Sequence, residues 1–376
     1  MRFLTAGESH GKSLVGIVDD FPSGVTIDQN FINQQLKRRQ SGYGRGQRMD
    51  IEEDTVEFLS GLNKGVSTGN PISFLIANLD WKNWKNNKEK PIYNPRPGHA
   101  DLNGVIKYHL KGIRDVIERS SARETAARVC AGALAREFLS GLGINIYSYV
   151  DNIGGITVKQ PVSMNVELWA QIENSELRVP DKDMESKIKL KIKSAGQQGD
   201  TLGGSFKVLA TNVPPGLGTY SQWDKRLDGM LAQHVMSIPA IKAVEVGDGF
   251  DARNISGTEF HDEIFYSKTK QFYRKTNHCG GIEGGISNGQ DIILGAVMKP
   301  IPTTTRGLKS VNIKTKQPEI SLKERSDVCA VPSASIVAEA MMAIVLAGAV
   351  QDKFGRDSME EILKSYNHWK KYYRSI

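Results

Sequence analysis

The longest apolar stretch of the chain runs from Ile336 to Val350 and includes a single charged residue, Glu339. It is shorter than the roughly 20 residues that a membrane span requires, and a segment that is apolar on all sides is typical of a helix buried within a protein. Residues 121–140 also carry small apolar residues at helical spacing, among them Ala126 and Ala133. Because helices lined with alanine can approach one another closely, the pattern predicts a packed central layer of helices.

Other segments show local signals of a helix or a strand. Residues 203–208 and 292–297 are short apolar runs bounded by turn residues and are predicted to be strands. Asp28 is a plausible N-cap for a helix that ends in the cations 37–39, and apolar spacing over 102–113 predicts another helix. Ser121 and Glu124 fit a capping box, which predicts the start of the alanine-rich helix.

One segment, residues 187–193, gives two readings. Its sequence K-I-K-L-K-I-K alternates as a strand does, yet Met184, Ile188 and Ile192 lie four apart as in a helix. The rest of the chain contains no repeat, no low-complexity segment and no linker rich in Pro, Gly or Ser. We therefore expect a single α/β domain over residues 1–376.

Composition narrows the class of protein. With 39% hydrophobic and 24% charged residues, the 376-residue chain has the balance of an ordinary globular protein. Its first residues lack the apolar core of a signal peptide, which predicts a cytoplasmic protein without a membrane anchor. The three cysteines lie far apart, with neither a Cys-x-x-Cys pair nor a histidine at metal-ligand spacing. They are expected to be reduced thiols, and no metal is expected.

The formal net charge of +7 comes with clustered cations at residues 37–48 and 82–90. Such clusters favour an anionic partner, either a polyanion or a small phosphorylated metabolite. A nucleic-acid-binding protein is one reading, supported by the basic run and by Trp81 and Trp84. A small-molecule kinase is another, because Gly7–Ser13 reads GESHGKS, one residue short of a nucleotide-binding phosphate loop. The missing residue would spoil the wrap of backbone amides around a phosphate, which argues against a nucleotide site.

Four loop-like stretches combine histidine, arginine, serine and glycine: residues 7–11, 96–101, 119–125 and 325–327. Loops of this kind commonly carry binding groups. Taken singly, His10 could be a surface-turn residue and His99 a helix cap. The serines at 120 and 121, at a predicted helix start, could hold an anion on their hydroxyls and backbone N–H groups.

Together these stretches make the chain resemble the chorismate synthase family from Phe3 to about Val350. The matching motifs are GESHG, RRQSGYGRG, RPGHAD, RSSARETAARV, GDTLGG, GDGF, GGIEGGISNGQ, the Lys299–Pro300 turn and RSDVCAVPSASIVAEAMMA. Their number, order and spacing make the resemblance specific. A nucleic-acid-binding protein would have no use for two loop histidines beside an Arg-Ser-Ser site.

The resemblance implies a reaction and a fold. The family converts 5-enolpyruvylshikimate 3-phosphate to chorismate by 1,4-anti elimination of phosphate, and it requires reduced FMN without net redox change. Its fold is a β-α-β sandwich in which two antiparallel sheets enclose a layer of small-residue-rich helices, and it assembles as a homotetramer. The family has a helix at residues 187–193. Whether NADPH serves as reductant on the chain itself or an external flavin reductase supplies the reduced flavin stays open.

The resemblance also implies roles for individual residues. His10 would be the general acid at the leaving phosphate, and His99 would stabilise reduced flavin near its N1. Asp327 would assist proton movement at flavin N5, and Ser9 and Ser121 would complete the relay. The arginines expected around the substrate are Arg39, Arg45, Arg48, Arg96, Arg123 and Arg325. The residues expected to hold FMN are Arg119, Ser120, Ser121, Pro239, Ala240, Gly284, Lys299, Pro300, Ile301, Pro302, Thr303 and Arg325.

The chain departs from the family pattern at three places. Val116-Ile117-Glu118 stands before Arg-Ser-Ser, where many members have glycines. Cys279 replaces a more common alanine, and Pro302 lies in the segment expected near the flavin. Cys279 and Pro302 replace no residue expected to be catalytic, so we expect them to affect cofactor affinity more than chemistry.

Overall fold

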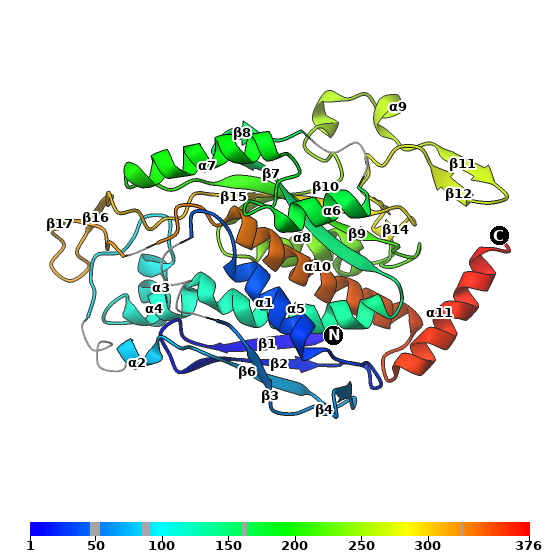
Figure 1. Ribbon diagram of the computed structural model, residues 1–376, viewed down its shortest axis with the longest axis horizontal. Helices are drawn as coiled ribbons and strands as arrows, with labels where there is room; N and C mark the ends of the chain where they lie inside the picture. The colour runs from blue at the N-terminus through cyan, green and yellow to red at the C-terminus, as the bar shows by residue number, and fades with distance from the viewer. Residues whose placement is uncertain (46–52, 85–90, 160–163, 325) are drawn as a thin grey trace.

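The computed structural model of the chain describes residues 1–45, 53–84, 91–159, 164–324 and 326–376, and it contains two main antiparallel sheets (Figure 1). The four-stranded sheet has the order β1 (Arg2–Gly7), β2 (Ser13–Asp19), β6 (Ile72–Ala77) and β3 (Val56–Phe58). The five-stranded sheet has the order β10 (Ile241–Val246), β15 (Ile292–Met298), β9 (Gly204–Thr211), β7 (Asn145–Ile153) and β8 (Ile156–Thr157). The mixed α/β class expected from the sequence is confirmed.

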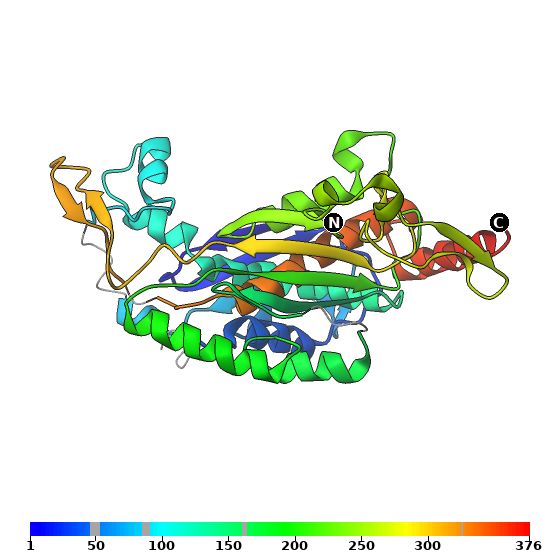
Figure 2. The same ribbon diagram turned by 90° about the horizontal axis from the view of Figure 1, so that it is seen from above.

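Helices and small hairpins make up the rest of the regular structure. The helices are α1 (Gln29–Gln40), α2 (Trp81–Trp84), α3 (Asp101–Tyr108), α4 (Arg114–Ser120), α5 (Thr125–Ser140), α6 (Val166–Asn174), α7 (Lys182–Gln197), α8 (Leu227–Met236), α9 (Gly257–Phe260), α10 (Val331–Phe354) and α11 (Met359–Tyr373). The hairpins are β4–β5 (Leu62–Asn63 and Val66–Ser67), β11–β12 (Ile264–Ser267 and Gln271–Arg274), β13–β14 (Ile282–Glu283 and Ile286–Ser287) and β16–β17 (Lys309–Val311 and Pro318–Ile320). In both views the β16–β17 hairpin and α11 lie at opposite ends of the molecule (Figure 2).

The centre of the fold is the contact between α5 and α10. A Cβ atom on Gly132 would lie 2.3 Å from the Cβ of Ala340, so glycine is required where the two helices touch. Helix α5 also contacts β2, whereas α10 contacts β7 and β9. The alternating burial of β2, with Leu14 and Val18 inside, turns one face of the sheet toward this core.

Helix α10 is long and apolar enough to cross a membrane, but 94% of its most apolar window is buried inside the protein. Its residues are apolar on every side because neighbouring elements surround it. This confirms the buried helix predicted for residues 336–350.

Several local predictions are confirmed. The Asp28 side chain accepts a hydrogen bond from the N–H of Asn30 at 2.9 Å and caps α1. The strands predicted at 203–208 and 292–297 are β9 and β15, which pair with Leu294 opposite Val208. Residues 187–193 lie within α7, where Ile188 and Ile192 are buried, so the spacing of four was the correct signal.

Two local predictions are wrong. The expected capping box does not form, because the Glu124 carboxylate instead accepts hydrogen bonds from Thr5 Oγ1 at 2.7 Å and Arg128 Nε at 2.9 Å. The Ser121 hydroxyl accepts from the N–H of Arg123 at 3.3 Å and begins a 3₁₀ turn over Ala122–Glu124, after which α5 starts. Residues 102–113 do not form one helix, since α3 ends at His109 in a left-handed conformation with φ of 53°.

Candidate active site

A cavity of about 830 Å³ opens where α1 ends, α4 meets α5 and α10 begins. Segments from eight parts of the chain contribute to its wall. Of the residues predicted for the site, those that line it are Ser9, His10, Arg39, Arg45, Arg96, His99, Ser120, Ser121, Arg123, Pro239, Ala240, Lys299, Ile301, Pro302, Thr303 and Asp327. Motifs that are far apart in the sequence thus meet at one place.

His10 lies on the turn between β1 and β2, with its ring held from two sides. Its Nδ1 lies 3.0 Å from Glu118 Oε1, and its backbone N–H donates to Glu118 Oε2 at 2.8 Å. The ring of Trp84 lies against the imidazole, with centroids 3.8 Å apart. The turn joins two antiparallel strands, whereas a nucleotide-binding phosphate loop leads from a strand into a helix. The nucleotide-loop reading of Gly7–Ser13 is therefore excluded.

His99 lies on the turn before α3 and is held by a buried carboxylate. Its Nδ1 lies 2.6 Å from Asp101 Oδ1, and Asp101 also accepts from Arg96 Nε at 2.8 Å. Burial alone would raise the pKa of Asp101, but hydrogen bonds from His99 and Arg96 outweigh it and hold that pKa well below its usual range. Arg96 Nη1 donates to Thr303 Oγ1 at 2.9 Å, which ties this turn to the segment after β15.

Arg39 and Arg123 share one carboxylate, that of Asp54. Arg123 Nη1 lies 2.7 and 2.6 Å from the two Asp54 oxygens, and Arg39 Nη2 lies 2.9 Å from Oδ2. Asn78 Oδ1 accepts from Arg123 Nε at 2.9 Å and from its Nη2 at 2.8 Å. Burial lowers the pKa of Arg39 to about 10, an effect that Asp54 opposes and that the nearby charges of Arg123 and Arg45 increase.

Asp327 lies far along the chain from these groups, just before α10, and it pairs with Arg45. Asp327 Oδ2 is 2.8 Å from Arg45 Nη1. Ser9 is buried, and its N–H donates to the carbonyl of Glu118 at 2.9 Å. The turn that precedes β2 and the helix α4 are thereby joined by backbone as well as side-chain contacts.

The segment 239–240 and the segment 299–303 form a further part of the wall. Lys299 Nζ donates to the carbonyl of Gly98, and the Lys299 N–H donates to the carbonyl of Ala240 at 3.0 Å. Ala240 has φ of 70°, a conformation that non-glycine residues rarely adopt and that often marks a functional site. Burial and the charge of Lys242 lower the pKa of Lys299.

The serines of the Arg-Ser-Ser motif do not stand at the start of an α-helix, so that prediction is wrong. Ser120 is the last residue of α4, and its hydroxyl donates to the carbonyl of Val116 at 2.5 Å. Both Ser120 and Ser121 nevertheless line the cavity.

Three predicted residues lie outside the cavity lining. The Arg119 guanidinium is directed to β1, where Nη2 donates to the Thr5 carbonyl at 2.8 Å. Gly284 lies in the turn between β13 and β14, and Pro300 is not among the lining residues although its neighbours are. Arg48 and Arg325 fall outside the residues that the structure describes.

Four residues of the site were not predicted. Asp101 could have been suspected from its place in RPGHAD, since a carboxylate two residues from a histidine can reach its Nδ1. Glu118 was noticed only as a departure from the family pattern. Asp54 and Asn78 carry no local signal, because they reach Arg123 from 69 and 45 residues away in the sequence.

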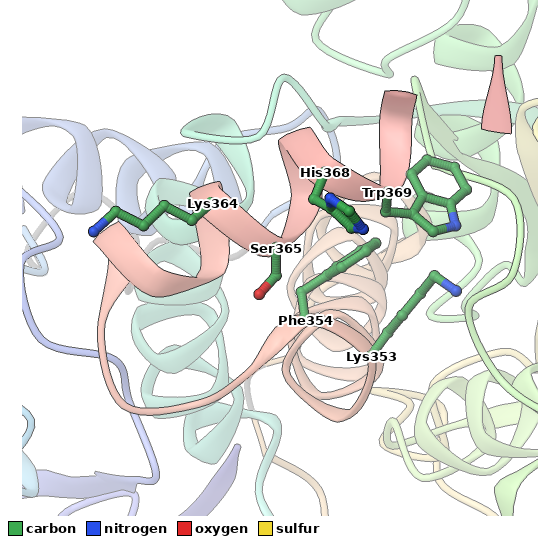
Figure 3. Close-up of a pocket in the computed structure, with 6 residues that line it drawn as sticks. All are labelled: Lys353, Phe354, Lys364, Ser365, His368 and Trp369. Atoms are coloured by element: carbon green, nitrogen blue, oxygen red, sulfur yellow. The ribbon is translucent and has the colours of Figure 1, made fainter. Parts of the chain in front are cut away.

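A second hollow, of about 410 Å³, lies between the end of α10 and α11 (Figure 3). Lys353, His368 and Trp369 line it, and the Lys353 ammonium lies 5.4 Å from the Trp369 ring. Lys364, also on its rim, pairs with Glu360. None of the predicted site residues lines this hollow, which distinguishes it from the cavity beside α4 and α5.

Cysteine and metal chemistry play no visible part in the described site. Cys130, Cys279 and Cys329 are free thiols, and burial raises the pKa of each of them, that of Cys279 to about 12. Within the described ranges, no group of three or more His, Cys, Asp or Glu side chains is arranged to hold a metal ion.

Comparisons with known proteins show the family to which the chain belongs. The family model for chorismate synthase matches residues 1–350. A chorismate synthase from Alkaliphilus metalliredigens (strain QYMF) is 52% identical over 379 residues, which cover 99% of each chain. The chain belongs to the chorismate synthase family. It is thus a carbon-oxygen lyase that forms chorismate in the shikimate pathway of aromatic amino acid biosynthesis.

Further chorismate synthases support this membership. That of Sulfurihydrogenibium sp. (strain YO3AOP1) is 50% identical over 375 residues and 96% of each chain. A crystal structure of a chorismate synthase superposes with a TM-score of 0.82 at 40% identity, covering 100% of this chain and 98% of the other. The lyase activity of the family replaces the kinase hypothesis made from Gly7–Ser13 and the nucleic-acid-binding hypothesis made from the basic runs.

Proposed function

We propose that the cavity beside α4 and α5 is where 5-enolpyruvylshikimate 3-phosphate loses phosphate by 1,4-anti elimination to give chorismate, with reduced FMN bound beside it. The observation that carries the proposal is the convergence of two carboxylate-held histidines, His10 and His99, on one arginine-walled cavity. Such a site can supply protons and bind a phosphorylated acid at once.

The charge of the wall fits the substrate, which bears a phosphate and two carboxylates. Arg39 and Arg123 both pair with Asp54, and Arg39 Nε has no acceptor among the described residues. A buried donor without a partner costs about 1–3 kcal/mol, and a bound anion would relieve an excess of positive charge. We assign Arg39, Arg45, Arg96 and Arg123 to the substrate, together with Arg48 and Arg325.

The lining also fits FMN. Apolar side chains such as Ile117, Ile238 and Val337 offer a surface for a flat ring, and Ser120, Thr303 and Lys299 offer donors for a phosphate. When bound, the reduced flavin supplies electron density to the allylic system as phosphate leaves. We assign the holding of FMN to Ser120, Ser121 and the segments 239–240 and 299–303, and, less directly, to Arg119 and Gly284.

The histidines and Asp327 have separate tasks in this scheme. His10 gives a proton to the departing phosphate, and Glu118 keeps Nδ1 occupied so that the proton leaves from Nε2. His99, oriented by Asp101, holds a proton beside the flavin ring. Asp327 would assist proton movement at flavin N5, while Ser9 and Ser121 link these groups. Arg45 Nη1, 2.8 Å from Asp327 Oδ2, holds this carboxylate in place at the cavity wall.

We further propose a single domain over residues 1–376 with the family's β-α-β sandwich, assembled as a homotetramer in the cytoplasm. The contacts of α5 with β2 and of α10 with β7 and β9 support a helical layer between two sheets. Ile264, Tyr266 and Phe272 are exposed on the β11–β12 hairpin and support self-association. The three free thiols support a reducing compartment.

An anaerobic assay tests the proposal. Purified protein is mixed with 5-enolpyruvylshikimate 3-phosphate and either reduced FMN, oxidised FMN, or oxidised FMN with NADPH, and chorismate and phosphate are followed. Product with reduced but not oxidised FMN is expected. Product in the NADPH arm would assign flavin reduction to the chain itself, and its absence would assign it to an external flavin reductase. No product with verified reduced flavin and folded protein would refute the proposed function.

A further inference from the structure

Glu118 is joined to the loop that carries His10 by three hydrogen bonds. Its carboxylate contacts both Nδ1 and the backbone N–H of His10, at 3.0 and 2.8 Å, and its carbonyl accepts the N–H of Ser9 at 2.9 Å. Glu118 is only 4% exposed and lies on the helix α4, which leads directly into the Arg-Ser-Ser motif. One buried residue therefore connects two functional segments.

The contact between Glu118 and Nδ1 of His10 decides which ring nitrogen of His10 can give a proton to a ligand in the cavity. An ionised carboxylate only accepts hydrogen bonds, so Glu118 keeps a proton on Nδ1 whether the ring is neutral or charged. Any proton that His10 gives up to a ligand must then leave from Nε2. Fixing the tautomer in this way is the usual task of a carboxylate beside a catalytic histidine.

The surroundings of the ring restrict its rotation as well. The Trp84 ring covers one face of the imidazole at a tilt of 31° and is held in turn by a 2.8 Å hydrogen bond from its Nε1 to Asp80. Arg114 lies 5.8 Å from the Trp84 ring, and its Nη1 is 3.7 Å from Glu118 Oε1. The imidazole is thus positioned by Glu118 at its Nδ1 edge and by Trp84 across its plane.

The partner of the second histidine offers a contrast. Asp101 shares its charge between His99 and three contacts with Arg96, namely the backbone N–H, Nε and Nη2. Glu118 lies 2.8 and 3.0 Å from the backbone nitrogen and Nδ1 of His10, and Arg114 Nη1 lies 3.7 Å from Glu118 Oε1.

We propose that Glu118 is a positioning residue for the reaction, which acts by holding His10 in the Nδ1–H tautomer with Nε2 toward the departing phosphate. The inference rests on the proposed function of His10 as general acid. Glu118 itself touches neither substrate nor cofactor in this account.

A kinetic double-mutant cycle tests whether Glu118 acts through His10. Glu118→Gln keeps the side-chain volume but removes the charge and one of the two acceptors for His10. We expect kcat to fall about 10–100-fold with KM changed by no more than about twofold, the range typical of groups that orient a functional side chain. In a His10→Ala background the same substitution should change kcat by less than about twofold.

A merely structural role would give a different result. Glu118→Gln would then lower activity by the same factor in both backgrounds, or leave kcat unchanged in the wild type, and either outcome overturns the inference. Glu173→Gln, which also removes an ion-paired carboxylate but lies away from the cavity, is the matched control and should leave kcat unchanged. Thermal unfolding of each variant checks that it is folded.

A measurement independent of turnover separates this inference from the proposed function. Long-range ¹H–¹⁵N spectra of histidine-labelled wild-type protein, assigned with His10→Gln, report the tautomer of His10 at a pH where its ring is neutral. We expect Nδ1–H in the wild type and a shift toward Nε2–H in Glu118→Gln. An Nε2–H tautomer in the wild type would overturn the inference even if chorismate forms. Inactive wild-type protein with the Nδ1–H tautomer would refute only the proposed function.

Discussion

Arg38 and Arg39 are neighbours in α1, yet their guanidinium groups lie in two different regions. Arg38 joins a closed network in which Glu339, fully buried in α10, and Glu173 accept its hydrogen bonds at 2.6–3.0 Å. Burial alone would lower the pKa of Arg38, but the two carboxylates outweigh it and raise that pKa. Arg39 lies at the cavity, where it shares Asp54 with Arg123, and burial lowers its pKa to about 10.

The two regions differ in their place in the fold, and the proposed function assigns only the arginines at the cavity to a ligand. Arg136 and Arg178 complete the Glu339 network by donating to Glu339 and to carbonyls of the chain, although Arg178 Nε has no acceptor among the described residues. Arg39 Nε is likewise a buried donor without an acceptor among the described residues, but Arg39 and Arg123 line the cavity, whereas the arginines of the network do not. Substitutions in the two regions should therefore affect different quantities: stability in the network and turnover or substrate affinity at the cavity.

The largest effect is expected at the histidines. His10→Ala and His99→Ala should each lower kcat by about 10²–10⁴-fold, because each removes a group that moves or holds a proton. FMN binding and the unfolding midpoint should change little. Anaerobic turnover, flavin titration and thermal unfolding measure the three quantities, and near-normal turnover in either variant would contradict the assigned role.

Glu339→Gln should lower stability and leave turnover nearly unchanged, which is the converse of the result expected for the histidine variants. It leaves Arg38, Arg136 and Arg178 without the carboxylate at their centre, and breaking a buried pair costs about 3–5 kcal/mol. We expect that loss in the free energy of unfolding, measured by denaturant titration, with kcat of the folded enzyme nearly unchanged. A large fall in kcat at full folding would remove the distinction between the two regions.

Asp327→Asn should slow turnover by about 100-fold, since its carboxylate is assigned to proton transfer and an amide cannot accept the proton. Substrate affinity should stay largely intact because Arg45, its partner at 2.8 Å, keeps its charge. Steady-state kinetics separate the two effects. A large loss of affinity with unchanged kcat would assign Asp327 to binding instead.

The pair Arg39→Lys and Arg38→Lys compares the two regions at adjacent positions. Lysine cannot reproduce the planar fork of arginine. Arg39→Lys should raise the KM for 5-enolpyruvylshikimate 3-phosphate about tenfold, which corresponds to about 1.4 kcal/mol. Arg38→Lys should lower the unfolding midpoint with KM unchanged. Equal effects on KM would show that the network also serves the substrate.

The smallest expected effect is on the pH dependence of stability. Burial alone would raise the pKa of Glu173, but hydrogen bonds and charge from Arg38 and Arg178 outweigh it and lower that pKa to about 2. An unfolded Glu titrates near about 4.3, so the stabilisation is present above that pH and is lost as the pH falls toward 2. Unfolding free energies measured from pH 6 down to 3 should decline less steeply in Glu173→Gln than in the wild type. Parallel slopes would contradict the assignment.

Much of the fold could be predicted because its signals are local. The N-cap at Asp28, strands β9 and β15 and the apolar helix α10 each depend on residues within a short window. The predicted capping box does not form, because the Glu124 carboxylate accepts hydrogen bonds from Thr5, which is distant in the sequence, and from Arg128. Of the helix predicted at 102–113 only the first part forms, as α3, because His109 adopts a left-handed conformation that ends it.

The candidate site could likewise be predicted only where its signals lie within short motifs of the sequence. Motifs around His10 and His99 located most of the cavity wall, because loops that carry histidine with arginine and glycine are rare enough to be recognised together. The sequence does not predict the carboxylates that orient these histidines and balance the arginines. Asp54 reaches Arg123 across 69 residues of sequence, so only the folded chain reveals the pair.

The most direct test of the central claim is a crystal structure of the protein with 5-enolpyruvylshikimate 3-phosphate and oxidised FMN bound. The account predicts both ligands in the cavity of about 830 Å³, with the substrate phosphate beside His10 and Arg39 and the flavin ring beside His99. Ligands bound elsewhere, such as the hollow beside Trp369, with that cavity empty, would contradict it.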